Sequence, residues 1–311
     1  MSKIATRESY GKALSELVKN NKNIIVLDAD LSKSTKTVDA KIASPEQHFN
    51  MGIAEGNMMS VAAGLASCGN TVFASTFAIF AAGRAFEQIR NSICYPKLNV
   101  KICATHAGLT VGEDGASHQS VEDISLMRSI PNMTVISPCD DIETRYAIEA
   151  ISKTSTPCYV RLGRVAVEAV NSDNYKFKLG KGVVLEEGEE VTIFATGFMV
   201  QQALKAANIL KDEGIKPTIV NIHTIKPIDS DLIVSLAKKS KLIVTCEEHN
   251  IIGGLGSTIC EVLSQHCPRK VALVGINDTF GESGTPNALI EKYGLTAENI
   301  ASVVISKLKE D

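Results

Sequence analysis

Short apolar runs alternate with longer segments of helical periodicity through most of the chain. Nearly continuous apolar runs are typical of strands that are buried on both faces of a sheet. In the first half, such runs stand at residues 24–27, 71–74, 100–105, 133–137 and 158–162. Helical patterns lie between them at residues 54–67, 81–93, 121–128 and 140–151. This alternation predicts a mostly parallel sheet with helices on both of its faces.

The pattern breaks at residues 166–181, a polar stretch that we interpret as a linker. A second alternating series follows, with strands expected at residues 191–195, 218–222, 242–246 and 271–275. The sequence therefore predicts an α/β fold with two doubly wound, mostly parallel sheets. We expect the first domain at residues 1–165 and the second at residues 182–311. Ligands of such sheets bind beyond the carboxyl ends of the strands, so the loops at those ends are the places to look for chemistry.

Charge and cysteine content narrow the class of protein. Lys and Arg total 32 against 35 Asp and Glu, which gives a net charge of −3 and no general attraction to nucleic acid or to anionic membranes. No apolar run is long enough to span a bilayer, so we expect neither a nucleic-acid nor a membrane partner. The eight cysteines form no C-x-x-C pair. We interpret them as reduced, buried residues of a cytoplasmic protein.

Two segments at predicted strand ends could carry chemistry. Glu55 stands among small and apolar residues at a helix start, where it is either a first-turn acid favoured by the helix dipole or a buried acid that shares a proton with a nitrogen heterocycle. Phe77 and Phe80 follow the strand at residues 71–74. They are either core residues or a flat wall on which an aromatic ring stacks.

The strongest local signal is the loop at residues 105–119. It carries His106, His118 and Asp114 together with three glycines, directly after a predicted strand. A loop of this length between regular elements is usually functional. Metal binding is the weaker interpretation, because the two histidines do not share a helix face and no third ligand has metal-site spacing.

Taken together, these segments resemble the C-terminal half of transketolase over almost the whole chain. The most specific similarity is the Thr-His pair followed by Gly-Glu-Asp-Gly and His-Gln at residues 105–119. Further support comes from Gly-Ile-x-Glu ending at Glu55, Thr-Phe-x-x-Phe at residues 76–80, and Phe-Gly-Glu-Ser-Gly at residues 280–284. The resemblance implies a thiamine-diphosphate pyrimidine-binding domain followed by a transketolase C-terminal-like domain.

The resemblance also implies roles for individual residues. Glu55 corresponds to the glutamate at N1′ of the aminopyrimidine, and Phe77 and Phe80 to the aromatics around that ring, with Phe80 as the stacking face. His106 and His118 correspond to the histidines that handle substrate hydroxyl and carbonyl protons. Asp114 corresponds to the acid that recognises a substrate hydroxyl. The sugar-phosphate ligands correspond to Arg7, Ser34, His106 and Arg164.

By this resemblance the reaction moves a two-carbon ketol unit from a ketose phosphate to an aldose, in pentose phosphate metabolism. Two positions depart from the family pattern: Gly56 replaces a larger polar residue, and Gly83 replaces an aromatic residue that many members have near the cofactor. The departures suggest a more open ring pocket.

A motif that the family uses elsewhere has no counterpart in this chain. The Gly-Asp-Gly motif with a downstream Asn, which binds the cofactor diphosphate through Mg²⁺ or Ca²⁺, belongs to the N-terminal half of transketolase. The chain's single Gly-x-Asp-Gly, residues 112–115, is part of the loop at residues 105–119, which we call the histidine loop. We therefore expect no metal site here, a separate N-terminal-half subunit that holds the metal, and an α₂β₂ assembly.

Two other interpretations stay open at this point. One is a subunit of another thiamine-diphosphate enzyme, either 2-oxo acid dehydrogenase E1 β-like or deoxyxylulose-phosphate synthase-like, because residues 247–256 also resemble the E1 β branch. The other is a non-catalytic α/β scaffold. The joint presence of Glu55, His106, Asp114 and His118 argues against a scaffold.

Overall fold

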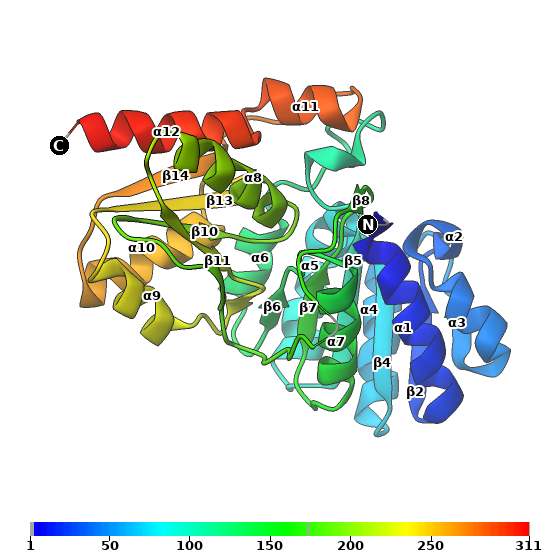
Figure 1. The fold of residues 1–311 in the computed structure, drawn as a ribbon. Helices are drawn as coiled ribbons and strands as arrows, with labels where there is room; N and C mark the ends of the chain where they lie inside the picture. Colours follow the sequence, from blue (N-terminus) through cyan, green and yellow to red (C-terminus); the bar gives the residue numbers. More distant parts are fainter. Residues whose placement is uncertain (1–2, 173, 311) are drawn as a thin grey trace.

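The computed structural model describes residues 3–172 and 174–310, whose strands form three sheets (Figure 1). The largest has seven strands and is parallel except at one edge. In spatial order its strands are β12 (Thr224–Lys226), β6 (Thr134–Ile136), β7 (Cys158–Arg161), β5 (Val100–Thr105), β4 (Thr71–Phe77), β2 (Ile24–Asp28) and β3 (His48–Asn50).

The second sheet has five strands and is again parallel except at one edge, where β9 runs antiparallel to β11. Its order is β14 (Val271–Ile276), β13 (Leu242–Asn250), β10 (Val191–Ala195), β11 (Pro217–Asn221) and β9 (Val183–Glu186). A short antiparallel pair joins β1 (Ile4–Ala5) to β8 (Ala166–Val167).

Helices cover both faces of each large sheet. The helical segments of the first half are α1 (Thr6–Asn20), α2 (Ser32–Thr35), α3 (Val38–Ala43), η1 (Pro45–Gln47), α4 (Glu55–Ser67), η2 (Phe80–Arg84), α5 (Phe86–Gln88), η3 (Ile89–Cys94), η4 (Leu109–Val111), α6 (Asp123–Ser129) and α7 (Asp141–Ser152). Those of the second half are α8 (Met199–Asp212), α9 (Ser230–Ala237), α10 (Leu255–His266), α11 (Pro286–Lys292) and α12 (Ala297–Lys309).

Four apolar clusters fill the spaces between these layers. On the first sheet, α4 packs into one cluster, while α1 and α7 pack into the cluster on the opposite face. On the second sheet, α8 and α12 lie on one face, and α9 and α10 on the other. The predicted α/β class with two doubly wound, mostly parallel sheets is confirmed.

Local sequence explains where α7 begins and how the following chain is held. The Asp140 carboxylate accepts a hydrogen bond from the Glu143 backbone N–H at 2.8 Å, which caps the helix as expected of an acid at this position. Its other oxygen accepts the backbone N–H groups of Val170 and Asn171 at 2.8 and 2.7 Å. This buried carboxylate therefore anchors the predicted linker to the first sheet.

Several expected elements differ in extent. The strand expected at residues 71–74 continues to Phe77, because Ser75 and Thr76 are buried in the same sheet and pair with β5. The helix expected at residues 81–93 contains two wide π-helical turns, η2 and η3. The strand β12 lies beyond the predicted domain boundary in the chain yet joins the first sheet antiparallel to β6. The two halves are therefore connected by backbone pairing.

The cysteine interpretation is confirmed in part. All eight cysteines are free within the described residues, and six of them are buried. Cys68 is exposed in the turn after α4, and Cys260 is half-buried on α10. Among the helices of the described chain, none combines the length and the apolar character that crossing a bilayer would need.

Candidate active site

The predicted site residues gather at the carboxyl edge of the first sheet. This edge is where ligands of doubly wound sheets bind. Reading from strand to strand, Ser34 follows β2, Glu55 follows β3, Phe77 and Phe80 stand at the end of β4, His106, Asp114 and His118 follow β5, Arg164 follows β7, and Arg7 stands in the first turn of α1.

Glu55 is the first residue of α4, and its side chain is 4% exposed. Arg84 Nη1 donates to both carboxylate oxygens, at 3.3 and 3.4 Å. The positive end of the helix dipole and this guanidinium both stabilise a negative charge on the buried acid. Glu55 is therefore both a first-turn acid and a buried acid, and a cation faces its carboxylate.

A row of flat side chains extends from this acid along the sheet edge. The guanidinium of Arg84 lies 4.0 Å from the centroid of the Phe80 ring. Phe80 and Phe77 are nearly parallel, with centroids 5.9 Å apart, and the His106 ring stacks on Phe77 at 3.9 Å. The row therefore runs from a carboxylate to an imidazole through two aromatic rings.

His106 is held in a defined tautomer. Its Nε2 lies 3.3 Å from Arg7 Nη1, and because a guanidinium only donates, Nε2 accepts. Nδ1 then carries the hydrogen and donates to Thr105 Oγ1 at 2.9 Å. Burial, followed by the charges of Arg7 and Arg164, lowers the pKa of His106 to about 3. The ring is therefore a neutral group that can exchange hydrogen bonds with a substrate.

The structure brings His118 to the same row and leaves Asp114 at the loop surface. The His118 ring stands edge-on to Phe80, 5.3 Å between centroids, and its Nδ1 lies 2.9 Å from Ser117 Oγ. His118 is half-buried, whereas Asp114 is exposed in the preceding turn. His118 thus stands edge-on to the row that ends at His106, and both imidazoles come from the same loop.

The predicted phosphate ligands meet only in part. Arg7 Nη1 donates to the backbone carbonyl of Ser34 at 2.9 Å, so this contact does not use the serine hydroxyl. Arg7 Nε is buried and, within the described residues, has no hydrogen-bond partner, which is an unusual state that an anionic ligand would relieve. Arg164 lies nearby, with Nη1 donating to Val111 O and, at 3.1 Å, to Glu113.

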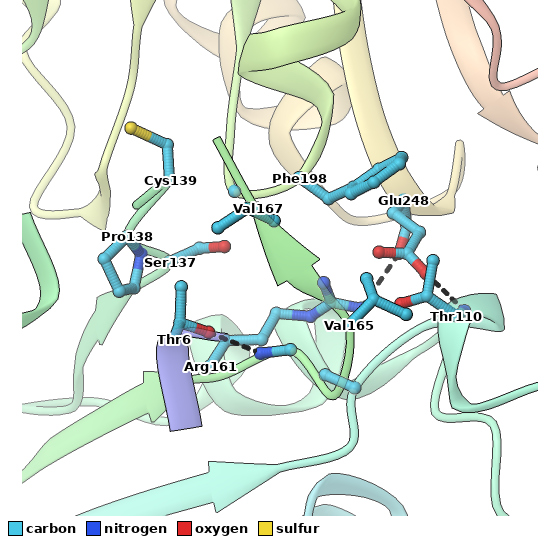
Figure 2. A pocket seen from close by; sticks show the side chains of 13 residues that line it. Thr6, Thr110, Ser137, Pro138, Cys139, Arg161, Val165, Val167, Phe198 and Glu248 are labelled. Atoms are coloured by element: carbon cyan, nitrogen blue, oxygen red, sulfur yellow. Dashed lines mark hydrogen bonds between the residues drawn. The ribbon is translucent and has the colours of Figure 1, made fainter. Parts of the chain in front are cut away.

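The second domain supports the histidine loop from behind. The Glu248 carboxylate of β13 accepts the Thr110 N–H at 2.7 Å (Figure 2). Gly108 has φ +82°, and a Cβ there would lie 2.4 Å from Glu248 Cδ, so only glycine allows this approach. Gln119 Nε2 donates to the Glu282 carbonyl at 2.9 Å, and α11 packs on η4 (Figure 1).

Behind this support lies a small cavity between the domains. Its volume is about 20 Å³, room for a single water molecule, and Thr6, Thr110, Arg161 and Glu248 are among its lining residues (Figure 2). Arg161 forms a buried ion pair with Asp123 at 2.9 Å and donates to the Glu248 carbonyl at 2.9 Å. The cavity is part of the inter-domain packing.

Two residues of this arrangement are not among those that the sequence motifs indicate. Arg84 has the pattern of a helix-surface charge, although its position four residues after Phe80 places both on one helical face. Glu248 stands in a motif that also resembles another enzyme branch, and its contact with Thr110 joins residues 138 positions apart. Only the first of these two could have been found from spacing.

Gly56 and Gly83, the two positions that depart from the family pattern, lie beside the aromatic row. A Cβ on Gly83 would meet nothing within 4 Å, and one on Gly56 would meet the Gln88 side chain at 3.4 Å. Larger residues would therefore fit at both positions, and the glycines leave space there. Within residues 3–172 and 174–310, no group of three or more His, Cys, Asp and Glu side chains is placed to hold a metal ion.

Comparison with known proteins gives matches over nearly the whole chain. The transketolase pyrimidine-binding domain matches residues 2–169, and the transketolase C-terminal domain matches residues 180–300. A Methanocaldococcus jannaschii protein, provisionally named as a transketolase C-terminal section, is 50% identical over 98% of this chain and 96% of its own length.

Two further relatives are similar along the same length. The 6-deoxy-6-sulfo-D-fructose transketolase subunit SqwH of Clostridium sp. is 41% identical over 94% of this chain and 91% of that protein. A solved structure of a split-gene transketolase, described as an inactive beta4 tetramer, is 54% identical, with a TM-score of 0.91 and 99% coverage of both chains.

Proposed function

The chain belongs to the transketolase family and corresponds to its C-terminal half, and we propose that it is one subunit of a two-polypeptide transketolase that transfers a two-carbon ketol unit from a ketose phosphate to an aldose. The observation that carries this proposal is the buried Glu55 carboxylate, which the Arg84 guanidinium links to the aromatic row. An acid in dry surroundings next to flat apolar rings suits a protonatable heterocycle.

The residues present fit thiamine diphosphate on its ring side. Glu55 and Phe80 would hold the aminopyrimidine, one by a hydrogen bond and the other by stacking. When bound, this cofactor supplies the electron sink that allows a carbon–carbon bond beside a ketose carbonyl to break. The contribution of Glu55 is to hold a proton shared with a ring nitrogen.

The histidine loop accounts for the substrate side of the proposal. The neutral His106 accepts at Nε2 and donates at Nδ1, so it can orient a hydroxyl or carbonyl oxygen once a substrate displaces Arg7 or Thr105. His118 faces the same row from the half-buried end of the loop. Asp114 is proposed to recognise a substrate hydroxyl from the exposed tip.

Arg7 and Arg164 account for the binding of a charged group on the ketose donor. Arg7 and Arg164 present guanidinium groups at the same edge of the sheet, and the Arg7 Nε–H has no hydrogen-bond partner within the described residues. Guanidinium groups bind phosphate oxygens bidentately, which supports a ketose phosphate as donor. The related subunit named for 6-deoxy-6-sulfo-D-fructose suggests that sulfonated donors belong in the same assay.

A partner subunit is part of the proposal. Relatives of matching length are named as a C-terminal section, a subunit and a split-gene product. The beta4 tetramer of the split-gene relative is described as inactive, which supports the need for a second kind of chain. We propose that an N-terminal-half subunit supplies the diphosphate site with Mg²⁺ or Ca²⁺, in an α₂β₂ assembly.

The proposal extends to the setting of the reaction. Eight free cysteines are typical of a reducing compartment, which supports a cytoplasmic protein. Ketol transfer between sugar phosphates is carbohydrate metabolism of the pentose phosphate kind.

Reconstitution tests the proposal. The chain is purified alone and together with the separately encoded N-terminal-half protein, with thiamine diphosphate and Mg²⁺, and ketol transfer from ketose phosphates to aldoses is measured. We expect transfer only by the mixture. Ketol transfer by the chain alone would contradict the need for a partner subunit. A mixture that decarboxylates pyruvate without cleaving ketoses would favour a subunit of another thiamine-diphosphate enzyme.

A further inference from the structure

Arg84 occupies an unusual position between the surface and the buried acid. Its side chain is 53% exposed, whereas that of Glu55 is 4% exposed. The guanidinium reaches inward to both Glu55 oxygens and at the same time covers the Phe80 ring at 4.0 Å. A planar cation thus hydrogen-bonds to the acid and stacks on the aromatic ring in one pose.

The proposed cofactor ring needs the same two contacts. An aminopyrimidine is also flat, also carries nitrogen donors when protonated, and is proposed to meet Glu55 at its edge and Phe80 at its face. Two planar groups cannot stack on the same area of one ring while bonding to the same carboxylate. The two occupants are therefore mutually exclusive in this geometry.

We propose that Arg84 is a placeholder for the aminopyrimidine ring, which holds Glu55 and Phe80 until the cofactor arrives and is displaced when the ring takes over both contacts. The inference rests on the proposed use of thiamine diphosphate. It assigns Arg84 a role in cofactor entry, distinct from the chemistry of Glu55.

The surroundings of Arg84 allow such a displacement. Half of the Arg84 side chain already faces solvent, so the guanidinium can turn to water without leaving a buried position, and cation–π contacts at exposed sites are weak. Glu55 is not left as an isolated buried charge, because the incoming ring nitrogen replaces the guanidinium. The wide turn η2 (Phe80–Arg84) places both partners of the stack on one short segment, and such turns are frequent at functional sites.

The test measures cofactor affinity in the reconstituted two-subunit complex at fixed Mg²⁺. Isothermal titration calorimetry compares thiamine diphosphate binding by the wild type, Arg84→Gln, Arg84→Lys and the control Arg90→Gln. Arg90 lies in the neighbouring segment η3, is exposed and bonds to Asn91. The control therefore removes one positive charge from the same region without touching Glu55 or Phe80.

The expected result has the opposite sign to a simple charge effect. Thiamine diphosphate is anionic, so removing a cation should weaken binding slightly, as in Arg90→Gln. Loss of a competitor should instead tighten it, and we expect Arg84→Gln to bind roughly three- to tenfold more tightly than wild type. Arg84→Lys keeps the charge but lacks the planar group, so its affinity should lie between those of the wild type and Arg84→Gln. Thiamine, which has the ring without the diphosphate, should show the same order.

Thiamine diphosphate binding by Arg84→Gln that is unchanged or weaker would contradict the placeholder role of Arg84. Weaker binding is the result expected if Arg84 contacts the bound cofactor. The circular dichroism spectrum and thermal midpoint of Arg84→Gln show that the variant is folded before titration. If the wild type and Arg90→Gln bind no thiamine diphosphate, the proposed function fails and the placeholder fails with it. If the wild type and Arg90→Gln bind thiamine diphosphate and Arg84→Gln shows no higher affinity, only the placeholder role of Arg84 is contradicted.

Discussion

His106 shows how one residue can combine several constraints. It adopts φ +57°, stacks on Phe77, and has both ring nitrogens in hydrogen-bond contact. A left-handed backbone is uncommon for a residue other than glycine, and histidine is among the residues that tolerate it best. Strained positions of this kind are concentrated at functional sites, which agrees with the role proposed for His106.

The lowered pKa of His106 predicts a pH dependence of stability. In the unfolded chain an imidazole takes up a proton below about pH 6.5, whereas the folded ring stays neutral down to about pH 3. The unfolded state therefore binds more protons in this window, and stability falls as the pH drops from 6.5. The contribution is at most about 1.4 kcal/mol per pH unit.

Urea unfolding at pH 7 and pH 5 measures this effect. We expect His106→Asn, which tolerates the same backbone conformation, to lose less stability than wild type on acidification. His266→Asn, at an exposed position, is the control. Glu247 contributes with the opposite sign, because burial raises its pKa to about 7, but it is present in every variant. Equal losses in wild type and His106→Asn would contradict the assignment.

At the scale of elements, the second domain positions the histidine loop. Glu248 on β13 accepts the Thr110 N–H, and residues 281–283 pack against Gln119 and Gly115. The loop leaves β5 with a left-handed residue and contains several positive-φ glycines, so its own backbone is not regular. Its shape therefore depends on contacts from β13 and from the segment before α11.

This dependence predicts that Glu248→Ala disturbs catalysis from outside the site. Removing a buried acceptor should cost about 1.5–3 kcal/mol of unfolding free energy. In the reconstituted complex it should also lower kcat roughly 10- to 100-fold, because misplaced groups lose much of their effect. Glu248→Gln keeps an acceptor oxygen and should recover most of kcat, and Glu187→Ala is the exposed control. A loss of stability without any change in kcat would show that the contact is only structural.

The sequence predicts best the elements whose signal is local. The strand expected at residues 191–195 agrees with β10 to the residue, and Asp140 indicates the start of α7 because an acid at the N-cap acts on its own helix. The strand β12 could not be predicted in this way, because three residues carry little periodicity and because its partner β6 is remote in the chain. The wide turns in η2 and η3 have no distinct sequence pattern.

The site is predictable to a similar extent. Glu55, Phe80 and His106 belong to motifs that resemble a family, and the fold brings them together at one sheet edge. The contact between Arg7 and Ser34 uses a backbone carbonyl, which no side-chain motif can predict. Arg84 and Glu248 act through contacts that exist only in the folded chain.

At the scale of the whole molecule, the row from Glu55 to His106 forms one wall of a site. The proposed partner would complete it, and apolar side chains at the rim should then be covered. Ile53, two residues before Glu55, is 76% exposed. A single exposed apolar side chain is ordinary by itself, but this one lies beside the wall that the proposed partner would cover.

We therefore predict that Ile53→Asp weakens binding to the N-terminal-half subunit about tenfold or more, since covering an unpaired carboxylate with the partner costs free energy. Tyr95→Asp is the control, because Tyr95 is 84% exposed but precedes β5 and so lies toward the opposite edge of the sheet. Analytical ultracentrifugation of the mixtures gives the two affinities. Equal affinities of wild type and Ile53→Asp would place the interface elsewhere.

The central claim is that Glu55 serves catalysis through a ring held at this edge. Its most direct test is kcat for ketol transfer by the reconstituted complex with Glu55→Ala, alongside Glu46→Ala, an exposed acid paired with Lys22. Loss of a general acid–base partner predicts a fall of about 10²- to 10⁴-fold for Glu55→Ala and no change for Glu46→Ala. Turnover by Glu55→Ala close to that of the wild type would contradict the account.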